Sequence, residues 1–433
     1  MAGDTIVIGA GPAGLGAALG LGDGATLLER GEVPGGLCQS VIVEGTAFDL
    51  GGHSFHTPHA AIRELVFDAI KMEEQRREAW CFVAGELIPY PFQRNLAHLR
   101  NPALREACLA GLAAAGDGSR AGTFDRYIEE RFGAGIARHF MRPYNEKLWG
   151  ADLSRLAAGW TAERIAEPAG TSAPAPEERR RSPLQGDTMV AYPAEGGFAE
   201  IYRALARRVP GLLYGQAVQR IDVRRGELVT QQGRRFAWKQ LVSALPLPAL
   251  IGMIEEVPQA IAADVARLVA LPVNLVLLAL TGRLENPMQR LYSPDPAITG
   301  HKFVFNHNSS AYLRALPRHG IQVEISGNRP EDDAALTELA ADSVRKLGLL
   351  PAGIDIAASR VIRLPYGYPV PTLERASIVA QASAWLESRS IFTLGRFGAW
   401  DYINSDEALY RGLALGRRLA GVTPVFEPGH TKA

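Results

Sequence analysis

Three glycines near the amino terminus have the spacing of a loop that binds phosphates. They are Gly9, Gly11 and Gly14 in "IVIGAGPAGLGAALG", and an apolar run, Thr5 to Ile8, leads into them. In such a loop the first glycine makes a tight turn, the second lets a pyrophosphate approach the backbone, and the third lets a helix pack on the strand. The phosphates then lie at the positive end of that helix. The pattern therefore predicts a dinucleotide-binding site.

An acidic residue strengthens this prediction. A second apolar run, "ATLL", is followed directly by Glu29, twenty positions after Gly9. At this distance a carboxylate accepts hydrogen bonds from the adenosine ribose. A glycine turn without a ligand is the alternative, but strand, helix, second strand and acid together favour a dinucleotide.

A second unusual segment is "ELIPYPFQRN", residues 86 to 95, in which two prolines, two aromatic rings and a glutamine occur together. No hydrophobic period explains it. The segment is either a rigid aromatic ledge that carries one amide, or a Pro-rich surface loop with a few buried rings.

The elements that must position these residues are predicted from periodicity. Residues 60 to 165 are expected to be largely helical, because apolar side chains recur four apart in "TFDRYIEERFGAGIARHF", at Phe124, Ile128, Phe132, Ile136 and Phe140. Pro143 must then disturb the helix. The following "FMRPYNEKLWG" holds more polar and aromatic groups than packing requires.

Bulk properties exclude several classes of protein. The 433 residues carry 46 basic and 46 acidic side chains, so no electrostatic case exists for binding nucleic acid or an anionic membrane. The longest apolar run, Leu268 to Leu280, is too short to span a bilayer and is broken by Pro272 and Asn274. Three cysteines without metal-ligand spacing suit a reducing compartment, which predicts a cytoplasmic protein.

The three histidines at 53, 56 and 59 raise the question of a metal site. No cluster of carboxylates accompanies them in the sequence, and we therefore predict no metal ion there.

The sequence after Glu29, "ERGEVPGGLCQSVIVEGTAFDLGGHSFH", resembles the FAD-dependent amine oxidase and protoporphyrinogen oxidase superfamily, in which a similar glycine pair follows the ribose acid. The resemblance implies a tightly held FAD, with the "GGH" turn near the isoalloxazine ring. The cofactor contacts that it implies are Gly9, Gly11, Pro12, Ala13, Gly14, Glu29, Arg30, Gly36, Leu37, Gly52, His53, Ser54, Val218, Gly395, Arg396 and Asp406.

Five further strings make the resemblance more specific. The strings "IPYPFQ", "FMRPYNEKLW", "ERIAEP", "GYPVPTLER" and "GRFGAWDY" occur in this order, as similar strings do in the UDP-galactopyranose mutase family. They most resemble those of its longer, eukaryotic-type members. The family uses reduced FAD, whose N5 attacks the anomeric carbon of a nucleotide sugar, to interconvert pyranose and furanose rings. NAD(P)H is a candidate external reductant. An oxidase or desaturase acting on an amine or a C–C bond is the alternative, and a nucleotide-sugar-binding protein without turnover is a third reading.

The resemblance also implies roles for individual residues. In the family the "PYPFQ"-like string holds uracil, and a glutamine amide matches the adjacent carbonyl and N–H of that base. Arg396 and Arg164 match arginines beside the diphosphate, the sugar and the flavin, and His53 is expected to set the polarity near N5. We therefore assign catalytic roles to Arg164, Arg396 and His53. The implied substrate contacts are Tyr90, Phe92, Gln93, Phe140, Tyr144, Asn145, Trp149, Arg164, Asp187, Tyr292, Tyr368 and Tyr402.

Four positions depart from the family pattern. Thr281 stands where a second diphosphate arginine is expected, and Asp187 where an asparagine is expected near the sugar. Glu195 and Asp401 likewise stand at arginine positions. Exchanging cations for carboxylates weakens diphosphate binding unless other positive groups compensate.

The predicted fold is α/β, with a Rossmann-like FAD-binding domain, a helical sub-domain and an antiparallel substrate-side sheet. We assign residues 1–60, 188–248 and 380–433 to the FAD domain, 61–187 to a mainly helical substrate-binding unit and 249–379 to the sheet. The expected partner is a nucleotide sugar, and assembly into a homo-oligomer stays open.

Overall fold

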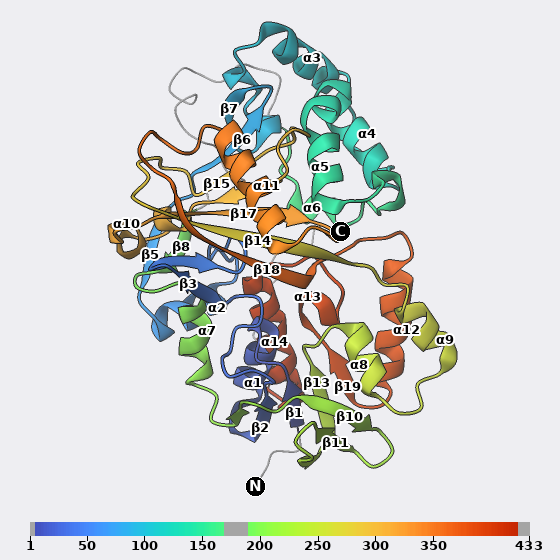
Figure 1. Cartoon of the computed structure of the whole chain (residues 1–433). Coiled ribbons are helices and arrows are strands. Elements are labelled where there is room, and N and C mark those ends of the chain that lie inside the picture. The colour runs from blue at the N-terminus through green and yellow to red at the C-terminus, as the bar shows by residue number, and fades with distance from the viewer. Residues whose placement is uncertain (1–4, 169–188, 423–433) are drawn as a thin grey trace.

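A five-stranded parallel sheet forms the lower part of the molecule in Figure 1. The computed structural model describes residues 5–168 and 189–422, and no helix in these ranges is long and apolar enough to cross a membrane. The strand order is β19-β13-β1-β2-β9. Its strands are β1 (Thr5–Ile8), β2 (Ala25–Leu28), β9 (Leu212–Leu213), β13 (Gln240–Ser243) and β19 (Ile391–Thr393). Apolar runs without alternation suit a parallel sheet covered on both faces.

Two helices from opposite ends of the chain pack together beside this sheet. Helix α1 (Pro12–Leu21) follows the glycine turn, and α14 (Ser405–Leu419) is the last described helix. A Cβ added at Gly412 would lie 2.1 Å from the Ala13 carbonyl oxygen, and one at Gly416 would lie 2.2 Å from that of Ala17. Only glycine permits this approach, which brings the carboxyl-terminal segment to the glycine turn.

A seven-stranded sheet crosses the middle of the molecule, in the order β18-β14-β17-β16-β15-β6-β7. Neighbouring strands are antiparallel except β15 and β6, which are parallel. The strands are β6 (Ala79–Val83), β7 (Glu86–Pro89), β14 (Ala270–Leu280), β15 (Arg290–Tyr292), β16 (Lys302–Val304), β17 (Gly320–Ser326) and β18 (Ile356–Pro369). Helix α11 (Asp333–Lys346) packs on one face of this sheet. The predicted substrate-side sheet is therefore present.

The upper unit is helical, as expected from the periodicity. Helices α3 (Pro102–Ala113), α4 (Phe124–Ile136), α5 (Arg142–Trp149) and α6 (Thr161–Arg164) form it, and all five members of the predicted apolar stripe are buried. A π-helical turn, Ala137–Met141, separates α4 from α5. It precedes Pro143, which lacks the N–H that a continuous α-helix needs.

One stretch differs from the helical expectation. Residues 72–89 form three strands: β5 (Met72–Arg76), which pairs with β8 (Met189–Pro193), and the hairpin β6–β7. In "AWCFV" the buried side chains alternate, at Ala79, Cys81 and Val83, which is the period of a strand. Ala84 and Gly85 then take positive φ angles and make the turn.

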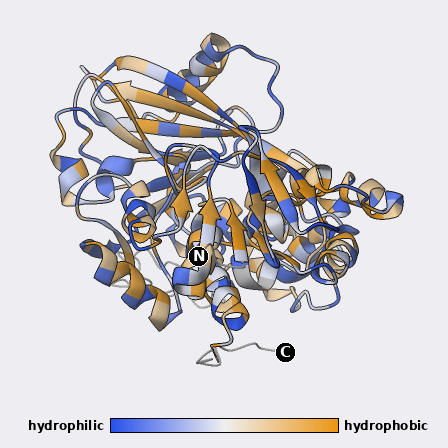
Figure 2. Cartoon of the chain, turned by 90° about the horizontal axis from the view of Figure 1, so that it is seen from below, coloured by the Kyte–Doolittle hydropathy of each residue, from blue (hydrophilic) through white to orange (hydrophobic). Residues whose placement is uncertain are grey.

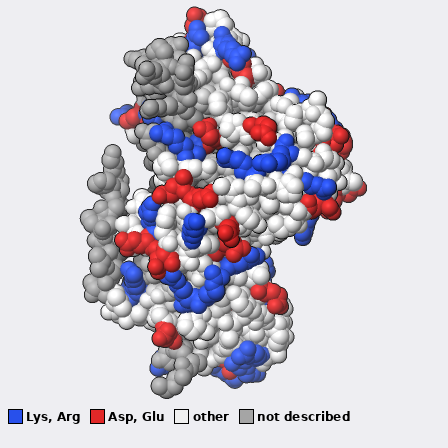
Figure 3. All heavy atoms as spheres, turned by 90° about the vertical axis from the view of Figure 1, so that its left-hand side faces the viewer, with Lys and Arg blue, Asp and Glu red and all other residues white. Residues whose placement is uncertain are grey.

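The remaining elements connect these units. They are the hairpin β3 (Ser40–Val43) and β4 (Thr46–Asp49), the sheet β10 (Val218–Asp222), β11 (Glu227–Thr230) and β12 (Arg235–Ala237), and the helices α2 (Ala60–Ala69), α7 (Ala199–Ala206), α8 (Leu247–Met253), α9 (Gln259–Val265), α10 (Ala311–Ala315), α12 (Arg375–Glu387) and α13 (Gly395–Gly398). Apolar residues concentrate on the strands (Figure 2), and side chains of both signs lie side by side on the face in Figure 3. The domain boundaries stay a prediction.

Candidate functional site

The predicted dinucleotide residues converge at the amino end of α1. Gly9 has a φ of +96°, and a Cβ added at Gly14 would lie 1.8 Å from the Gly9 carbonyl oxygen. Gly11 faces Gly36, where a Cβ would lie 3.2 Å from the Gly11 Cα, so a side chain here would enter the narrow space between the two segments. No side chain of the described residues caps the α1 amino end, and its N–H groups remain available to an anion.

Glu29 and Gly395, two of the other predicted cofactor residues, lie at this end of the helix. The Glu29 carboxylate accepts hydrogen bonds from the Ala10 and Gly31 N–H groups, both at 2.8 Å, which fixes it at the end of β2. Gly395 has a φ of +82°, and a Cβ there would lie 3.0 Å from the Ala13 Cβ. Pro12 starts α1, Asp406 lies in the first turn of α14, Leu37 follows the Gly35–Gly36 turn, Val218 is buried in β10, and Arg30 is exposed.

The "GGH" turn is held by a buried carboxylate that sequence reasoning missed. The Gly52 N–H donates to Glu324 Oε1 at 3.1 Å, and Lys302 Nζ lies 2.9 Å from the same oxygen. Burial would raise the pKa of Glu324, but Lys302, His301 and the Gly52 N–H together bring it down to about 2. Glu324 is therefore ionised at neutral pH.

His53, in the same turn, is neutral. Burial lowers its pKa to about 4, and the charges of Lys302, Arg396 and Arg290 act in the same direction. Its Nε2 lies 3.2 Å from the Leu50 carbonyl oxygen. Since a carbonyl only accepts, Nε2 carries the proton. The ring stacks on Phe198, with a centroid separation of 4.9 Å. This arrangement fits the expected polar role better than that of a free base.

Aromatic rings from several segments form two groups, and the Tyr368 hydroxyl of the second group donates to Glu324 at 3.4 Å. Phe92 stacks on Phe140 at 5.0 Å, Phe140 on Tyr144 at 5.4 Å, and Tyr144 meets Tyr292 edge-on at 5.9 Å. Tyr90, whose ring centroid lies 4.9 Å from that of Tyr292, completes the first group. Trp149, Tyr368 and Tyr402 contact one another and form the second group. Asn145 instead donates to the Met141 carbonyl oxygen within its own helix. Asp187 lies outside the described residues.

Two predicted arginines border the second aromatic group. Arg164 donates through Nε to the Tyr402 carbonyl oxygen at 2.6 Å, and its guanidinium lies 4.6 Å from the Tyr402 ring. The Arg396 guanidinium lies 5.6 Å from that ring and 5.9 Å from Tyr368. Burial lowers the pKa of Arg164, and Arg396 lowers it further, while Tyr402 opposes them.

Gln93 is connected to the same cluster. Its amide donates at 2.8 Å to the carbonyl oxygen of Ala166, two residues after Arg164. The predicted base-binding and diphosphate-binding groups therefore lie on one side of the molecule and not on opposite faces.

Two further arginines add positive charge that the sequence analysis did not assign. Arg77 donates from Nη2 to the Tyr292 hydroxyl at 3.0 Å, and its buried Nε has no hydrogen-bond partner among the described residues. Arg290 donates to Ser54 at 3.3 Å. Burial and the nearby charge of Arg77 together lower the pKa of Arg290 to about 10. In residues 5–168 and 189–422, no carboxylate lies within ion-pair distance of Arg77, Arg290 or Arg396.

For two of the residues that sequence reasoning missed, Arg290 and Glu324, the alternation of side chains along a strand could have predicted the position. Arg290 and Tyr292 are two apart in β15, and residues two apart in a strand share a face. In β17, Ile321, Val323 and Ile325 enter the core, so Glu324 must lie on the opposite face. Arg77, in the charged run "EEQRRE", carried no such signal.

The three departures that lie in the described residues, Thr281, Glu195 and Asp401, do not add an unpaired carboxylate to this cluster. Asp401 pairs with Arg411 at 2.7 Å, and Arg375 lies 3.7 Å away. Glu195 is exposed. The Thr281 hydroxyl accepts a hydrogen bond from the Asp355 N–H just after the end of β14. Thr281 is ten residues along the chain from Leu271, whose partner in β18 is Tyr368 of the second aromatic group. At the rise of a strand this distance is about 30 Å. Besides Arg164 and Arg396, the cations at this site are Arg77, between β5 and β6, Arg290 of β15 and Lys302 of β16.

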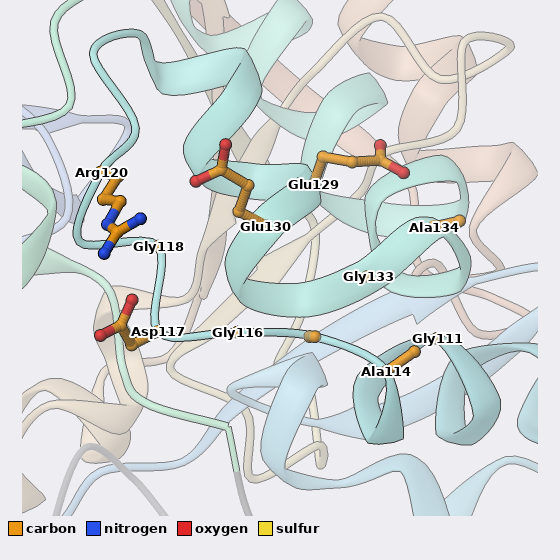
Figure 4. Close-up of a pocket in the computed structure, with 11 residues that line it drawn as sticks. Gly111, Ala114, Gly116, Asp117, Gly118, Arg120, Glu129, Glu130, Gly133 and Ala134 are labelled. Carbon is orange, nitrogen blue, oxygen red and sulfur yellow. The ribbon is translucent and has the colours of Figure 1, made fainter.

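An open hollow of about 480 Å³ lies elsewhere, between α3 and α4 (Figure 4). Asp117, Arg120, Glu129 and Glu130 line it together with small residues. Glu129 pairs with Arg142 and Glu130 with Arg126, so these carboxylates already have partners. None of the predicted site residues lines this hollow.

Comparison with known proteins identifies the family. The model of flavin-containing amine oxidoreductases matches residues 12–347, which is 336 of the 433 residues. The chain belongs to this family. Membership indicates a flavin cofactor, in agreement with the glycine cradle, the uncapped helix end and Glu29.

Solved structures agree on the fold of this family member. A reduced UDP-galactopyranose mutase has a TM-score of 0.89 and 27% identity, covering 98% of this chain and 97% of that one. A putative protoporphyrinogen oxidase from Exiguobacterium sp. 255-15 has a TM-score of 0.72 at 14% identity, with coverage of 97% and 99%. Cyclohexylamine oxidase from Brevibacterium oxydans IH-35A has 0.69 at 15%, with the same coverage. The last two support the fold alone.

Proposed function

We propose that this flavoenzyme is a nucleotide-sugar mutase that interconverts pyranose and furanose forms of a sugar, with UDP-galactose as the first candidate. The observation that carries the proposal is the aromatic cluster bordered by Arg77, Arg164 and Arg396 beside the Gly52–His53 turn. The mutase likeness, at 27% identity over nearly the whole chain, supports it.

The rings and Gln93 suit the nucleotide base. Aromatic faces stack on bases, and an amide donates and accepts at once. Gln93 is only 3% exposed, and its NH₂ group donates to Ala166, so its oxygen and a repositioned NH₂ are the groups that would meet uracil. In this arrangement the base lies near Phe92 and Phe140, away from the "GGH" turn.

The guanidinium groups suit the diphosphate. Arginine side chains bind phosphate oxygens through paired hydrogen bonds. A bound diphosphate would also neutralise the charge of those arginines that have no carboxylate partner among the described residues. Tyr292, Tyr368 and Tyr402 add hydroxyl donors. Arg396 is expected to stabilise the charge that develops on the departing diphosphate.

The flavin, when bound and reduced, would supply the nucleophilic nitrogen, and the protein supplies binding and orientation. The turn at Gly52 and His53, together with the ionised Glu324 that holds it, would set the polarity of the surroundings of this flavin nitrogen. No acid–base triad is required of the protein, and NAD(P)H is proposed as the reductant.

Reduced protein incubated with UDP-galactofuranose is expected to yield a product of unchanged mass and new chromatographic retention. Arg396→Ala should lower turnover by about 100-fold or more, because it removes a donor that acts on developing charge. Arg126→Ala, at an exposed pair with Glu130, is the control and should retain activity.

Other results would decide against the proposal. Hydrogen peroxide formed from an amine by the oxidised protein, without isomer from the tested nucleotide sugars, would identify an amine oxidase instead. Substantial turnover by Arg396→Ala would remove this residue from the site.

A further inference from the structure

Lys147 has an unusual environment for a lysine. Its Nζ donates toward four backbone carbonyl oxygens: Ser293 at 2.9 Å, Asp295 at 3.0 Å, Ile298 at 2.6 Å and Gly300 at 2.9 Å. An ammonium group has three N–H donors, so four carbonyl oxygens are enough to accept hydrogen bonds from all of them. These four oxygens are called the cage below. Burial lowers the pKa of Lys147 to about 8 while Asp295 opposes this, so the amine is mostly protonated at neutral pH.

The cage does not depend on an ion pair. Among the described residues no carboxylate lies within ion-pair distance of Lys147, and the Asp295 carboxylate accepts instead from the Ala297 N–H at 2.9 Å. Carbonyl oxygens that converge on one point repel each other unless a cation lies between them. The ammonium therefore determines the conformation of the loop, residues 293–300.

This loop connects two strands that supply site residues. Tyr292 ends β15 just before the loop, and Lys302 begins β16 two residues after it. Lys147 lies on α5, three residues after Tyr144, and residues at this spacing share a helix face. The Tyr144 ring lies 5.9 Å from Tyr292 and 6.3 Å from His301.

We propose that Lys147 is a positioning residue, whose ammonium group holds the 293–300 loop against α5 and thereby places Tyr292 and Lys302 around the substrate diphosphate. The inference rests on the proposed function for its ligand, but the loop clamp itself does not.

The chain offers a matched control on the same loop. Lys346, on α11, donates to the Ala297 carbonyl oxygen at 3.3 Å, but it is a single contact from a half-exposed side chain that also pairs with Asp342. Lys346→Ala removes a lysine from the loop without emptying the cage.

The first measurement is hydrogen–deuterium exchange of residues 293–301 in the flavin-loaded protein. In Lys147→Ala these amides are expected to exchange about tenfold faster or more, because local opening becomes easier when the cage loses its cation. Ammonium chloride should restore protection, whereas tetramethylammonium chloride should not, because it has no N–H donor. Lys346→Ala should resemble the wild type.

The second measurement separates positioning from general destabilisation. For Lys147→Ala, KM for the nucleotide sugar should rise about tenfold while kcat falls less than about threefold, because the diphosphate is held less well in ground and transition states alike. Ammonium chloride should lower KM again. The affinity for UDP alone should follow KM.

Several outcomes would overturn the inference. Unchanged exchange of the loop in Lys147→Ala would exclude the clamp, and faster exchange with unchanged UDP affinity would exclude its effect on the site. If Lys147→Ala does not fold, Lys147→Arg, which retains charge and donors, must keep the loop protected and bind UDP. A wild-type protein without mutase activity would contradict the proposed function, while the exchange experiment would still judge the clamp.

Discussion

At the scale of single residues, we propose that Arg77 is placed for binding at the expense of stability. Its guanidinium is in contact with Tyr292 and lies 5.6 Å from the Tyr90 ring, and no described carboxylate neutralises it. A buried charge without a partner of opposite sign destabilises a fold, and functional sites commonly contain such groups.

Arg77→Met is therefore expected to change stability and affinity in opposite directions. The free energy of unfolding should rise by about 1 kcal/mol, because methionine removes a partly buried charge that has no described carboxylate partner but fills similar space. UDP affinity should fall by about tenfold, through loss of one cation near the diphosphate. Thermal unfolding and calorimetric titration measure the two effects.

Arg142→Met is the matched control for this experiment. Arg142 lies on α5 and pairs with Asp125 and Glu129, both at 2.7 Å. Its removal should not raise stability and should leave UDP affinity unchanged. A lower unfolding temperature for Arg77→Met, with unaltered affinity, would mean that Arg77 is only a structural residue.

At the scale of elements, the contact between α1 and α14 positions the cofactor end of the molecule. Gly16 and Gly20 of α1 also oppose backbone atoms of α14, with added Cβ atoms 2.3 Å and 2.4 Å from the Leu409 and Leu413 carbonyl oxygens. Neither helix can move without displacing the amino end of α1, which faces Gly36.

Gly412→Ala should separate these helices. The new methyl group would lie 2.1 Å from the Ala13 carbonyl oxygen, and overpacking of this kind costs about 2 kcal/mol of unfolding free energy. Flavin content, read from the visible absorbance relative to protein, should fall too. Gly24→Ala meets no atom within 4 Å and should leave both quantities unchanged. Equal flavin content in the two variants would contradict the role assigned to this contact.

At the scale of the whole molecule, Glu324 of the seven-stranded sheet is linked to the turn at Gly52. Its carboxylate accepts from Gly52, 272 positions away in the chain, and from Tyr368 at 3.4 Å. Because the pKa of about 2 in the folded protein lies below the ordinary glutamate value of 4.5, its stabilising contribution is present above pH 4.5 and is lost as pH falls toward 2.

Glu324→Gln should therefore flatten the dependence of stability on acid. Between pH 6 and pH 3 the wild type should lose about 2 kcal/mol of unfolding free energy through this group, as proton linkage requires. The variant should lack this component, while other acids and buried histidines continue to contribute. Urea unfolding at several pH values tests this, and parallel curves for the two proteins would refute the assignment.

Local patterns were sufficient for much of the fold. The glycine turn, Glu29, the stripe from Phe124 to Phe140 and the strands around Gly320 and Ala270 depend on neighbours within one turn or one strand. The spacing of apolar and polar side chains along the chain is enough to predict such elements. The exception at residues 72–89 is a short alternation that the surrounding helical signal hid.

By itself the sequence determined the flavin-binding topology and the residue types of the site. Only the tertiary structure decided how its charges are paired: Asp401 pairs with Arg411, Thr281 lies at the far end of β14, Arg77 contacts Tyr292, Lys147 contacts the 293–300 loop, and Glu324 contacts Gly52. The physical reason is that the energetic effect of a charged side chain depends on its burial and on its neighbours. These neighbours come from segments up to hundreds of residues apart in the chain.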